Sequence, residues 1–333
     1  MRVGVHTSIA GGVENAAHRA KKLGCDTFQM FSANPRGWKT LDLPPEDCER
    51  FHEAVARYGL SPVVVHDNYL INLAAEDLAI RKKSRAAFRR EIVRAVALGA
   101  DYLVTHPGSA KATTTSKALA TCVDSLRKAA RGLALNGLTI LIENTAGQGM
   151  ALGRTFKEVA EIISGAAKDL PVGACIDTAH CFAASYPIHT PQGLAETLKQ
   201  LDSTVGLENV RVIHANDSKT AFASRADRHQ HIGKGWIGVE AFARIVRHPK
   251  LRRIPFICET PIDRPGDDKR NLRMVRKLAG ASHSVRSSEF GVRRSATPNS
   301  ELRTRNLSFN GLELRSTKNR GQVAEALGRG QAL

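Results

Sequence analysis

Three features that mark other classes of protein are missing from this sequence. No run approaches the ~20 apolar residues that a membrane-spanning helix needs, so we expect no membrane span. The chain starts MRVGVHTS, without a charged segment followed by a long apolar stretch, and we expect no signal peptide. The six cysteines are scattered without a CxxC pair, which favours reduced, mostly buried thiols over a disulfide framework. We therefore expect a cytoplasmic protein.

Acidic residues are scarce relative to basic ones. The 333-residue chain has 49 Lys and Arg against 32 Asp and Glu, a formal net charge of +17. Such a surplus favours polyanionic partners, nucleic acid first, and hence a protein associated with the nucleoid. A basic protein whose charge serves no specific partner is the alternative.

Short apolar runs, mostly β-branched or aromatic, recur along the chain as buried parallel strands do. Amphipathic helical stretches lie between them, for example at 11–24, 84–100, 122–137 and 155–166. Eight strands alternating with helices over about 260 residues predict a TIM (β/α)8 barrel, an α/β fold. A doubly wound open sheet is the alternative, but no GxGxxG turn follows the first strand. The predicted strands are 2–8, 27–32, 61–67, 102–108, 139–145, 172–178, 210–217 and 255–260.

Six of these strands end in a side chain that can bind a metal. In a barrel these ends converge on the face where active sites lie. Histidines and carboxylates buried together need a counter-ion, which a metal supplies. The six residues are His66, His106, Glu143, Asp177, His214 and Glu259.

Further ligands come from two nearby segments. His180 lies three residues after Asp177 in CIDTAH, so the two fall on one side of a turn. The segment ADRHQH (226–231) precedes several glycines and is predicted to be a loop, where Asp227 and His229 share a face. His231 shares that face too, so this stretch alone does not choose between the two histidines.

The number and chemistry of the candidates suggest more than one ion. Five histidines and four carboxylates exceed the needs of a single metal, so two or three ions are implied. The nitrogen and oxygen mixture suits zinc, with manganese or iron as alternatives. Three divalent ions and four carboxylates leave a charge of about +2, which suits a phosphate ester.

At this point the residues match a known family: the chain resembles endonuclease IV, the AP endonuclease of base-excision repair. The resemblance covers roughly residues 1–280, which we assign to one catalytic domain. It rests on long, ordered motifs: HDNYLINLA (66–74), HPGS (106–109), IENTAGQG (142–149), CIDTAH (175–180), HANDSK (214–219), SRADRH (224–229) and CET (258–260).

The resemblance implies a phosphodiesterase with three zinc ions, manganese or iron being able to replace zinc at one position. Its substrate would be duplex DNA, cut 5′ to an abasic site to leave a 3′-hydroxyl, or cleared of 3′-blocking groups. A metal-bound hydroxide would be the nucleophile, without a covalent intermediate. By this resemblance, His66 and His106 would hold the first zinc, and Glu143 would bridge the first and second zincs. The second zinc would be completed by Asp177, His214 and Glu259. The third zinc would be held by His180, Asp227 and His229. The DRH match selects His229, and His231 becomes a loop residue near the site.

The resemblance also implies DNA-inserting loops. Arg36, in NPRGW, matches the family's intercalating arginine, and Tyr69 and Leu70, in DNYLIN, match its second loop. Pro35 departs from the glutamine that some members carry there. The alternative for Tyr69 and Leu70 is ordinary capping of the barrel. We expect a monomer that flips the abasic sugar out of the stack.

Two other functions compete with this interpretation. A sugar isomerase or epimerase of the xylose-isomerase type would use Glu143, Asp177, His214 and Glu259 with one or two ions, and would need neither the other five ligands nor a basic surface. A non-catalytic DNA-binding barrel would not need nine competent ligands.

The pattern changes after residue 280. Residues 281–333 lack an apolar period, are rich in Ser, Asn and Arg, and carry nine Lys and Arg against four Glu. We predict a disordered basic C-terminal extension, outside the resemblance, that either adds nonspecific DNA affinity or is inert.

Overall fold

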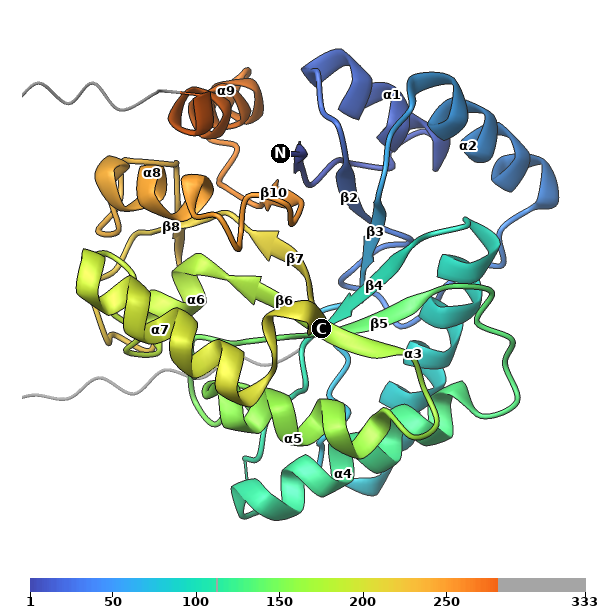
Figure 1. Ribbon diagram of the computed structural model, residues 1–333. Helices are drawn as coiled ribbons and strands as arrows, with labels where there is room; N and C mark the ends of the chain where they lie inside the picture. The colour runs from blue at the N-terminus through green and yellow to red at the C-terminus, as the bar shows by residue number, and fades with distance from the viewer. Residues whose placement is uncertain (112, 281–333) are drawn as a thin grey trace, which may run out of the picture. The chain divides into compact units, whose positions relative to one another are not determined.

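The computed structural model describes residues 1–111 and 113–280, and within them eight parallel strands form a ring (Figure 1). Their order is β1-β10-β7-β6-β5-β4-β3-β2. A parallel bridge between His6 and Gln29, just beyond β1 and within β2, closes the ring. The predicted TIM barrel is confirmed. The strands are β1 (Val3–Val5), β2 (Phe28–Phe31), β3 (Val63–His66), β4 (Tyr102–Thr105), β5 (Thr139–Glu143), β6 (Val172–Asp177), β7 (Val210–His214) and β10 (Phe256–Cys258).

Helices cover the outside of the ring and separate successive strands (Figure 1). Two helices follow β6, and a small antiparallel pair, β8 (Asp217–Ser218) with β9 (His229–Gln230), is inserted after β7. The helices are α1 (Glu14–Leu23), α2 (Pro45–Tyr58), α3 (Leu78–Ala97), α4 (Thr115–Ala130), α5 (Phe156–Ala166), α6 (Thr178–Ala183), α7 (Pro191–Thr204), α8 (Val239–Arg247) and α9 (Asp267–Gly280), with the 3-10 turn η1 (Leu207–Asn209) before β7.

Local sequence sets where these helices start and stop. The hydroxyls of Thr114, Thr155 and Thr190 accept hydrogen bonds from backbone amides three residues later, which caps the starts of α4, α5 and α7. Gly24 and Gly59 end α1 and α2 with φ of 85° and 62°. These left-handed angles suit glycine, because a Cβ would crowd the backbone there.

Two predicted helical stretches are displaced: α3 spans Leu78–Ala97 where 84–100 is predicted, and α4 differs in the same way. The sequence 122–137 was expected to be helical, but α4 spans Thr115–Ala130. The cap at Thr114 starts the helix earlier, and Gly132, with φ of 73°, turns the chain away after its end. Residues 133–137 instead form the turn that leads into β5.

The barrel has two separate apolar cores. The larger lies between the strands and the surrounding helices and includes Phe28, Phe88 and Phe242. The smaller fills the inside of the ring with one residue from each of six strands, as TIM barrels do. Its members are Val64, Val104, Leu141, Cys175, Val212 and Ile257.

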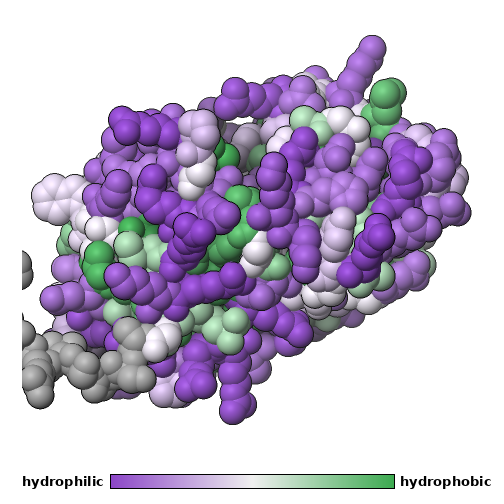
Figure 2. Space-filling model, turned by 90° about the horizontal axis from the view of Figure 1, so that it is seen from above, coloured by the Kyte–Doolittle hydropathy of each residue, from purple (hydrophilic) through white to green (hydrophobic). Residues whose placement is uncertain are grey.

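One face of the molecule and its cysteines can be compared with the sequence-based expectations. Figure 2 shows a flank covered mainly by hydrophilic side chains. Among the residues that the structure describes, no helix is both long and apolar enough to cross a bilayer. All six cysteines fall within the described ranges and are free. The predicted extension at 281–333 lies outside the described residues.

Candidate metal centre

The six strand-end ligands share one relationship to the inner core. Each lies two residues after an interior residue: Val64 precedes His66, Leu141 precedes Glu143, and Val212 precedes His214 in this way. Because side chains alternate along a strand, each of these six side chains points into the barrel, one layer above the smaller apolar core. His106 and Glu259 lie one residue beyond β4 and β10, and the other four are the last residues of their strands.

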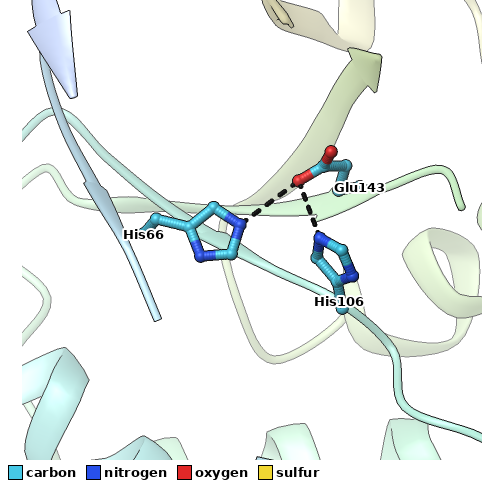
Figure 3. Close-up of side chains that lie close together, drawn as sticks. All are labelled: His66, His106 and Glu143. Carbon is cyan, nitrogen blue, oxygen red and sulfur yellow. Dashed lines mark hydrogen bonds and ion pairs between the residues drawn. The ribbon is translucent and has the colours of Figure 1, made fainter. Parts of the chain in front are cut away.

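Glu143 lies at the centre of the cluster and is fully buried. Its Oε2 lies 3.3 Å from Nε2 of His66 and 3.2 Å from Nε2 of His106, so one carboxylate oxygen faces both rings (Figure 3). Its other oxygen, Oε1, lies 3.1 Å from Nδ1 of His214. The two oxygens of Glu143 thus face two different sets of histidines, which is the position of a bridging ligand.

Two further groups adjoin this one. Donor atoms of Glu143, Asp177, His214 and Glu259 all lie within 4.8 Å of one another. Oε2 of Glu259 is 3.1 Å from Nδ1 of His214, the ring atom that Glu143 also faces. This second group has three carboxylates around one imidazole, and hence a strong demand for positive charge.

The third group is centred on His180, in the first turn of α6, and His229, in β9. Oδ1 of Asp227 is 3.2 Å from Nε2 of His180 and 3.4 Å from Nε2 of His229. Asp177 also lies within reach, 3.7 Å from His229. The structure thus brings all nine sequence-predicted ligands into three adjoining groups.

Backbone carbonyls fix the orientation of three of the histidine rings. Nδ1 of His66 donates to the carbonyl of Asp67 at 2.9 Å, and Nδ1 of His180 donates to that of Asn144 at 2.9 Å. Nδ1 of His229 donates to the carbonyl of Glu259 at 3.2 Å. Nε2 of each ring is then left with its lone pair facing the cluster, the arrangement typical of metal-binding histidines.

Two of these nitrogens are orphaned. Nε2 of His180 and Nε2 of His229 are buried, and neither makes a well-aligned hydrogen bond within the described part of the chain, although Oδ1 of Asp227 lies 3.2 and 3.4 Å from them. A buried nitrogen without a donor costs free energy, unless a cation takes its lone pair. The donor chemistry and these orphaned atoms together fit divalent metal ions.

The pKa values express the same demand for positive charge. Burial lowers the pKa of His66, but its hydrogen bond to Glu143 and the charges of nearby carboxylates outweigh burial and raise the pKa to about 9. Burial raises the pKa of Glu143, but the charges of His214 and His106 hold it well below its usual range. Both shifts favour positive charge within the cluster, which bound metal ions would supply.

Three polar residues that the sequence analysis did not single out hold the ligands in place. Gln29 Oε1 accepts a hydrogen bond from Nε2 of His214 at 2.8 Å, and its Nε2 donates to Glu259. Asn216 donates to Asp177 Oδ2 at 2.6 Å and accepts from the amide of Glu259 at 2.8 Å. Asn144 follows a ligand directly, as IEN, and accepts from the amide of Asp177 at 2.7 Å. The available signals were a polar residue inside the apolar run TFQMF and asparagines beside predicted ligands.

His231 belongs to a separate group. It is buried, and its Nδ1 accepts a hydrogen bond from Asn271 Nδ2 at 3.0 Å, so its Nε2 points toward Asp263 and Asp267. The guanidinium of Arg270 lies 2.8 Å from Asp267 and already supplies positive charge there. This group ties the loop that follows β9 to α9, and the structure keeps His231 apart from the nine ligands.

The candidate DNA-contacting residues lie on two loops that are bonded to each other. Arg36 and Tyr69 are exposed, Tyr69 by 61%, and Leu70 is half-buried. The amide of Tyr69 donates to the carbonyl of Pro35 at 3.1 Å, and Asn68 Nδ2 donates to the carbonyl of Gly37. The departure at Pro35 therefore leaves intact a backbone contact that holds the two loops together.

A pocket of about 420 Å³ opens at this cluster of candidate ligands. Tyr69, Arg228 and Ile262 line its rim, and His106, His180 and His229 line its floor. It is large enough for a sugar and its phosphate, with an aromatic ring and a guanidinium at its mouth.

Known proteins resemble this chain in sequence. The xylose isomerase-like TIM barrel family model matches residues 17–278. A "probable endonuclease 4" of Solibacter usitatus is 50% identical over 283 residues, covering 84% of this chain and 98% of the relative. Another of the same name, from Methanoculleus marisnigri, is 43% identical over 279 residues, covering 84% and 99%.

Solved structures resemble it as well. Endonuclease IV from Thermus thermophilus superposes with a TM-score of 0.74 at 38% identity, covering 84% of this chain and 98% of the other. A D-tagatose 3-epimerase-like protein superposes with a TM-score of 0.62 at 22% identity, a likeness in fold alone. Sequence identity of this extent, together with the matched fold, shows that the chain belongs to the endonuclease IV family of xylose isomerase-like TIM barrels.

Proposed function

We propose that the protein is a DNA-repair endonuclease that hydrolyses the phosphodiester 5′ to an abasic site in duplex DNA. The product would carry a 3′-hydroxyl, and the same site would remove 3′-blocking groups. One observation supports this most: nine side chains of the types that bind metal ions gather at a single pocket in a member of the endonuclease IV family. A phosphate ester suits a site that is positively charged once its metals are bound.

Three zinc ions fit the three groups of ligands. His66, His106 and Glu143 would hold the first; Glu143, Asp177, His214 and Glu259 the second; His180, Asp227 and His229 the third, with manganese or iron able to replace zinc at one position. When bound, zinc supplies Lewis-acid stabilisation of charge on phosphate oxygens and lowers the pKa of water.

The protein's own side chains set the geometry for this chemistry. Glu143 lies between His66 and His214, and as a shared ligand it would set the separation of the first two metal sites. Cys175 lies beside Glu143 and His214, but it is fully buried and burial raises its pKa to about 12, which disfavours a role as nucleophile. We therefore propose direct hydrolysis without a covalent enzyme intermediate.

Recognition of the abasic site would come from the two bonded loops. Arg36 would insert into the duplex, and Tyr69 and Leu70 would occupy the space left when the sugar flips into the pocket. Flipping costs a few kcal/mol, least where a base is already missing, which favours an abasic site over an intact nucleotide. Tyr69 is exposed and lines the pocket, and Arg36 is exposed on the loop that is bonded to Tyr69, which supports these roles.

The cellular setting follows from charge and chemistry. We propose a monomer that acts on duplex DNA in the cytoplasm and associates with the nucleoid. The formal net charge of +17 supports attraction to DNA phosphates.

The test pairs metal analysis with cleavage. Purified protein is analysed for metals by mass spectrometry and incubated with a duplex that carries one abasic site. About three zinc ions per chain, with a single nick on the 5′ side of the lesion, would support the proposal. One metal ion, no nick and conversion of a free ketose would favour a sugar epimerase, whose fold this chain shares. DNA binding that is unaffected by chelation, without any nick, would favour a non-catalytic barrel.

A further inference from the structure

The loop that carries Arg36 has no regular structure of its own. Residues 32–44, all within the described part of the chain, connect β2 to α2 without a helix or strand. Loops of this length in a barrel are commonly functional and need side chains to hold their shape. The contacts that hold this loop come largely from α3, which follows the next strand.

Arg94 of α3 joins the two ends of the loop. Its Nη2 donates to the carbonyl of Ser32, where the loop begins, and its Nη1 donates to the carbonyl of Leu41, near where it ends. Its Nε donates to the hydroxyl of Ser32 at 3.0 Å. One planar guanidinium therefore bonds three loop oxygens, a geometry that lysine cannot reproduce.

Because Arg94 is buried, its hydrogen bonds favour one conformation of the loop over others. Arg94 is 8% exposed, Glu91 is 4% exposed, and Ser32 is fully buried. The Ser32 hydroxyl accepts from Arg94 and donates to Glu91 Oε2 at 2.7 Å. A buried guanidinium is costly unless its donors are bonded. Any loop conformation that removes these oxygens leaves Arg94 unsatisfied.

Other residues of α3 hold both candidate DNA-contacting loops. Arg90 donates to the carbonyl of Trp38 at 3.1 Å, and Nζ of Lys83 lies 4.5 Å from the centre of the Trp38 ring. The hydroxyl of Ser84 accepts a hydrogen bond from the amide of Asn72 at 3.1 Å, within the loop that follows β3. One face of α3 therefore supports the loops of Arg36 and of Tyr69 together.

We propose that Arg94 is a positioning residue for lesion recognition: it locks residues 32–44 in the conformation that presents Arg36 to the duplex. The inference rests on the proposed function. Because these hydrogen bonds would hold the loop in one conformation before DNA binds, the duplex would not have to order the loop on binding. Loss of the Arg94 hydrogen bonds should therefore weaken binding of abasic DNA and leave the chemistry at the metal centre intact.

The test uses Arg94→Lys with Arg89→Lys as the matched control. Arg89 lies on the same helix and bonds backbone carbonyls, those of Ala129 and Arg131, at 2.9 and 2.8 Å. These lie beside α4 and away from the loop. Nicking of a duplex with one tetrahydrofuran abasic analogue is measured for kcat and KM, with zinc content measured on each protein.

We expect Arg94→Lys to raise KM about tenfold, the equivalent of one lost charge-assisted hydrogen bond, with kcat and zinc content unchanged. Arg89→Lys should match the wild type. An unchanged KM for Arg94→Lys overturns the inference and leaves the proposed function standing. Loss of zinc or of kcat in Arg94→Lys also overturns it, because the role would then be general to the fold. A wild type that nicks no abasic duplex overturns the proposed function and this inference with it.

A second measurement reads the loop without DNA. The loop contains two exposed trypsin sites, after Arg36 and Lys39, and exchanging Arg94 for Lys leaves the number of trypsin sites unchanged. Native-state trypsin cleavage within 32–44 should be faster in Arg94→Lys than in the wild type or Arg89→Lys. Equal cleavage rates would show that Arg94 does not hold the loop.

Discussion

Gln29 and His214 are joined by a hydrogen bond of 2.8 Å between the amide oxygen of Gln29 and Nε2 of His214. Because an amide oxygen only accepts, His214 must carry its proton on Nε2. Its Nδ1 is then free to face Glu143 and Glu259, both at 3.1 Å. His214 therefore presents Nδ1 to the cluster, whereas His66, His180 and His229 present Nε2. The hydrogen bond from His214 to Gln29 accounts for this difference.

The first prediction concerns this bond. Gln29→Leu should lower zinc affinity by about ten- to a hundredfold, because residues that orient a metal ligand typically contribute that much. The affinity is measured by competition with a chromophoric chelator. Gln192→Leu, at an exposed position on α7, is the control and should bind zinc as the wild type does. Unchanged affinity in Gln29→Leu would show that His214 is held by its other contacts alone.

The second prediction concerns the bridging carboxylate. Glu143→Gln should lose most activity, by about a hundredfold or more, while the fold survives. The amide keeps the volume of the side chain but removes the charge that the surrounding histidines face. Nicking rates, zinc content and circular dichroism are compared with those of Glu161→Gln, an exposed change on α5. Retained activity with full zinc content would refute a bridging role.

Much of this site could be predicted because alternation along a strand is a strict rule. Once Val64, Leu141 and Val212 are assigned to the inside of the barrel, the ligands two residues later must point there too. The eight strands were predictable for a different reason: short apolar runs bounded by turns leave few alternatives to buried strands.

The remainder depends on contacts between distant segments. Gln29 meets Glu259 only because the ring closes between the first two strands, and no local pattern encodes that partner. The start of α4 was misjudged because the cap at Thr114 lies outside the apolar period that was used to find the helix. Arg94 looks like any helix arginine until the loop folds over it.

The third prediction separates lesion reading from general attraction to DNA. Arg36→Ala should weaken binding of an abasic duplex with little effect on an intact duplex, because the side chain would fill the space at the lesion. Lys39→Ala, an exposed cation of the same loop, should weaken both duplexes alike through a lost phosphate contact. Binding is measured by fluorescence anisotropy with protein that has been treated with a metal chelator, so that the DNA is not cleaved. Equal losses on both duplexes in Arg36→Ala would contradict a lesion-reading role.

The fourth prediction concerns thiol reactivity. Burial raises the pKa of Cys25 to about 11, and of Cys122 and Cys175 to about 12. Cys181 and Cys258 are buried as well, whereas Cys48 is half-buried. With Ellman's reagent at pH 8, the native protein should therefore react at Cys48 only, and all six thiols should react after unfolding in guanidinium. Rapid reaction of several thiols in the native state would contradict the buried arrangement.

The same shifts give a pH dependence of stability. A thiol whose folded pKa is raised keeps its proton in the native state after the unfolded chain has lost it. Its contribution is complete below the unfolded value, near 9, and is lost as the pH rises toward the folded value of about 11 to 12. The urea concentration at the midpoint of unfolding should therefore decrease as the pH is raised from 9 to 11. A variant with Cys122→Ala should show a smaller fall.

The last prediction concerns residues 284–333. Ending the chain at His283 should leave the melting temperature within ~2 °C of the full-length value, because α9 ends at Gly280 and both apolar cores lie within residues 3–278. A large drop would show that the extension contributes to the fold.

The removed segment carries nine Lys and Arg against four Glu. If it touches DNA phosphates, the truncated protein will show a shallower dependence of intact-duplex affinity on salt, by close to one unit of slope for each lost contact. An unchanged slope would assign the whole electrostatic attraction to the barrel, whose own surplus of positive charge is the larger share of the +17.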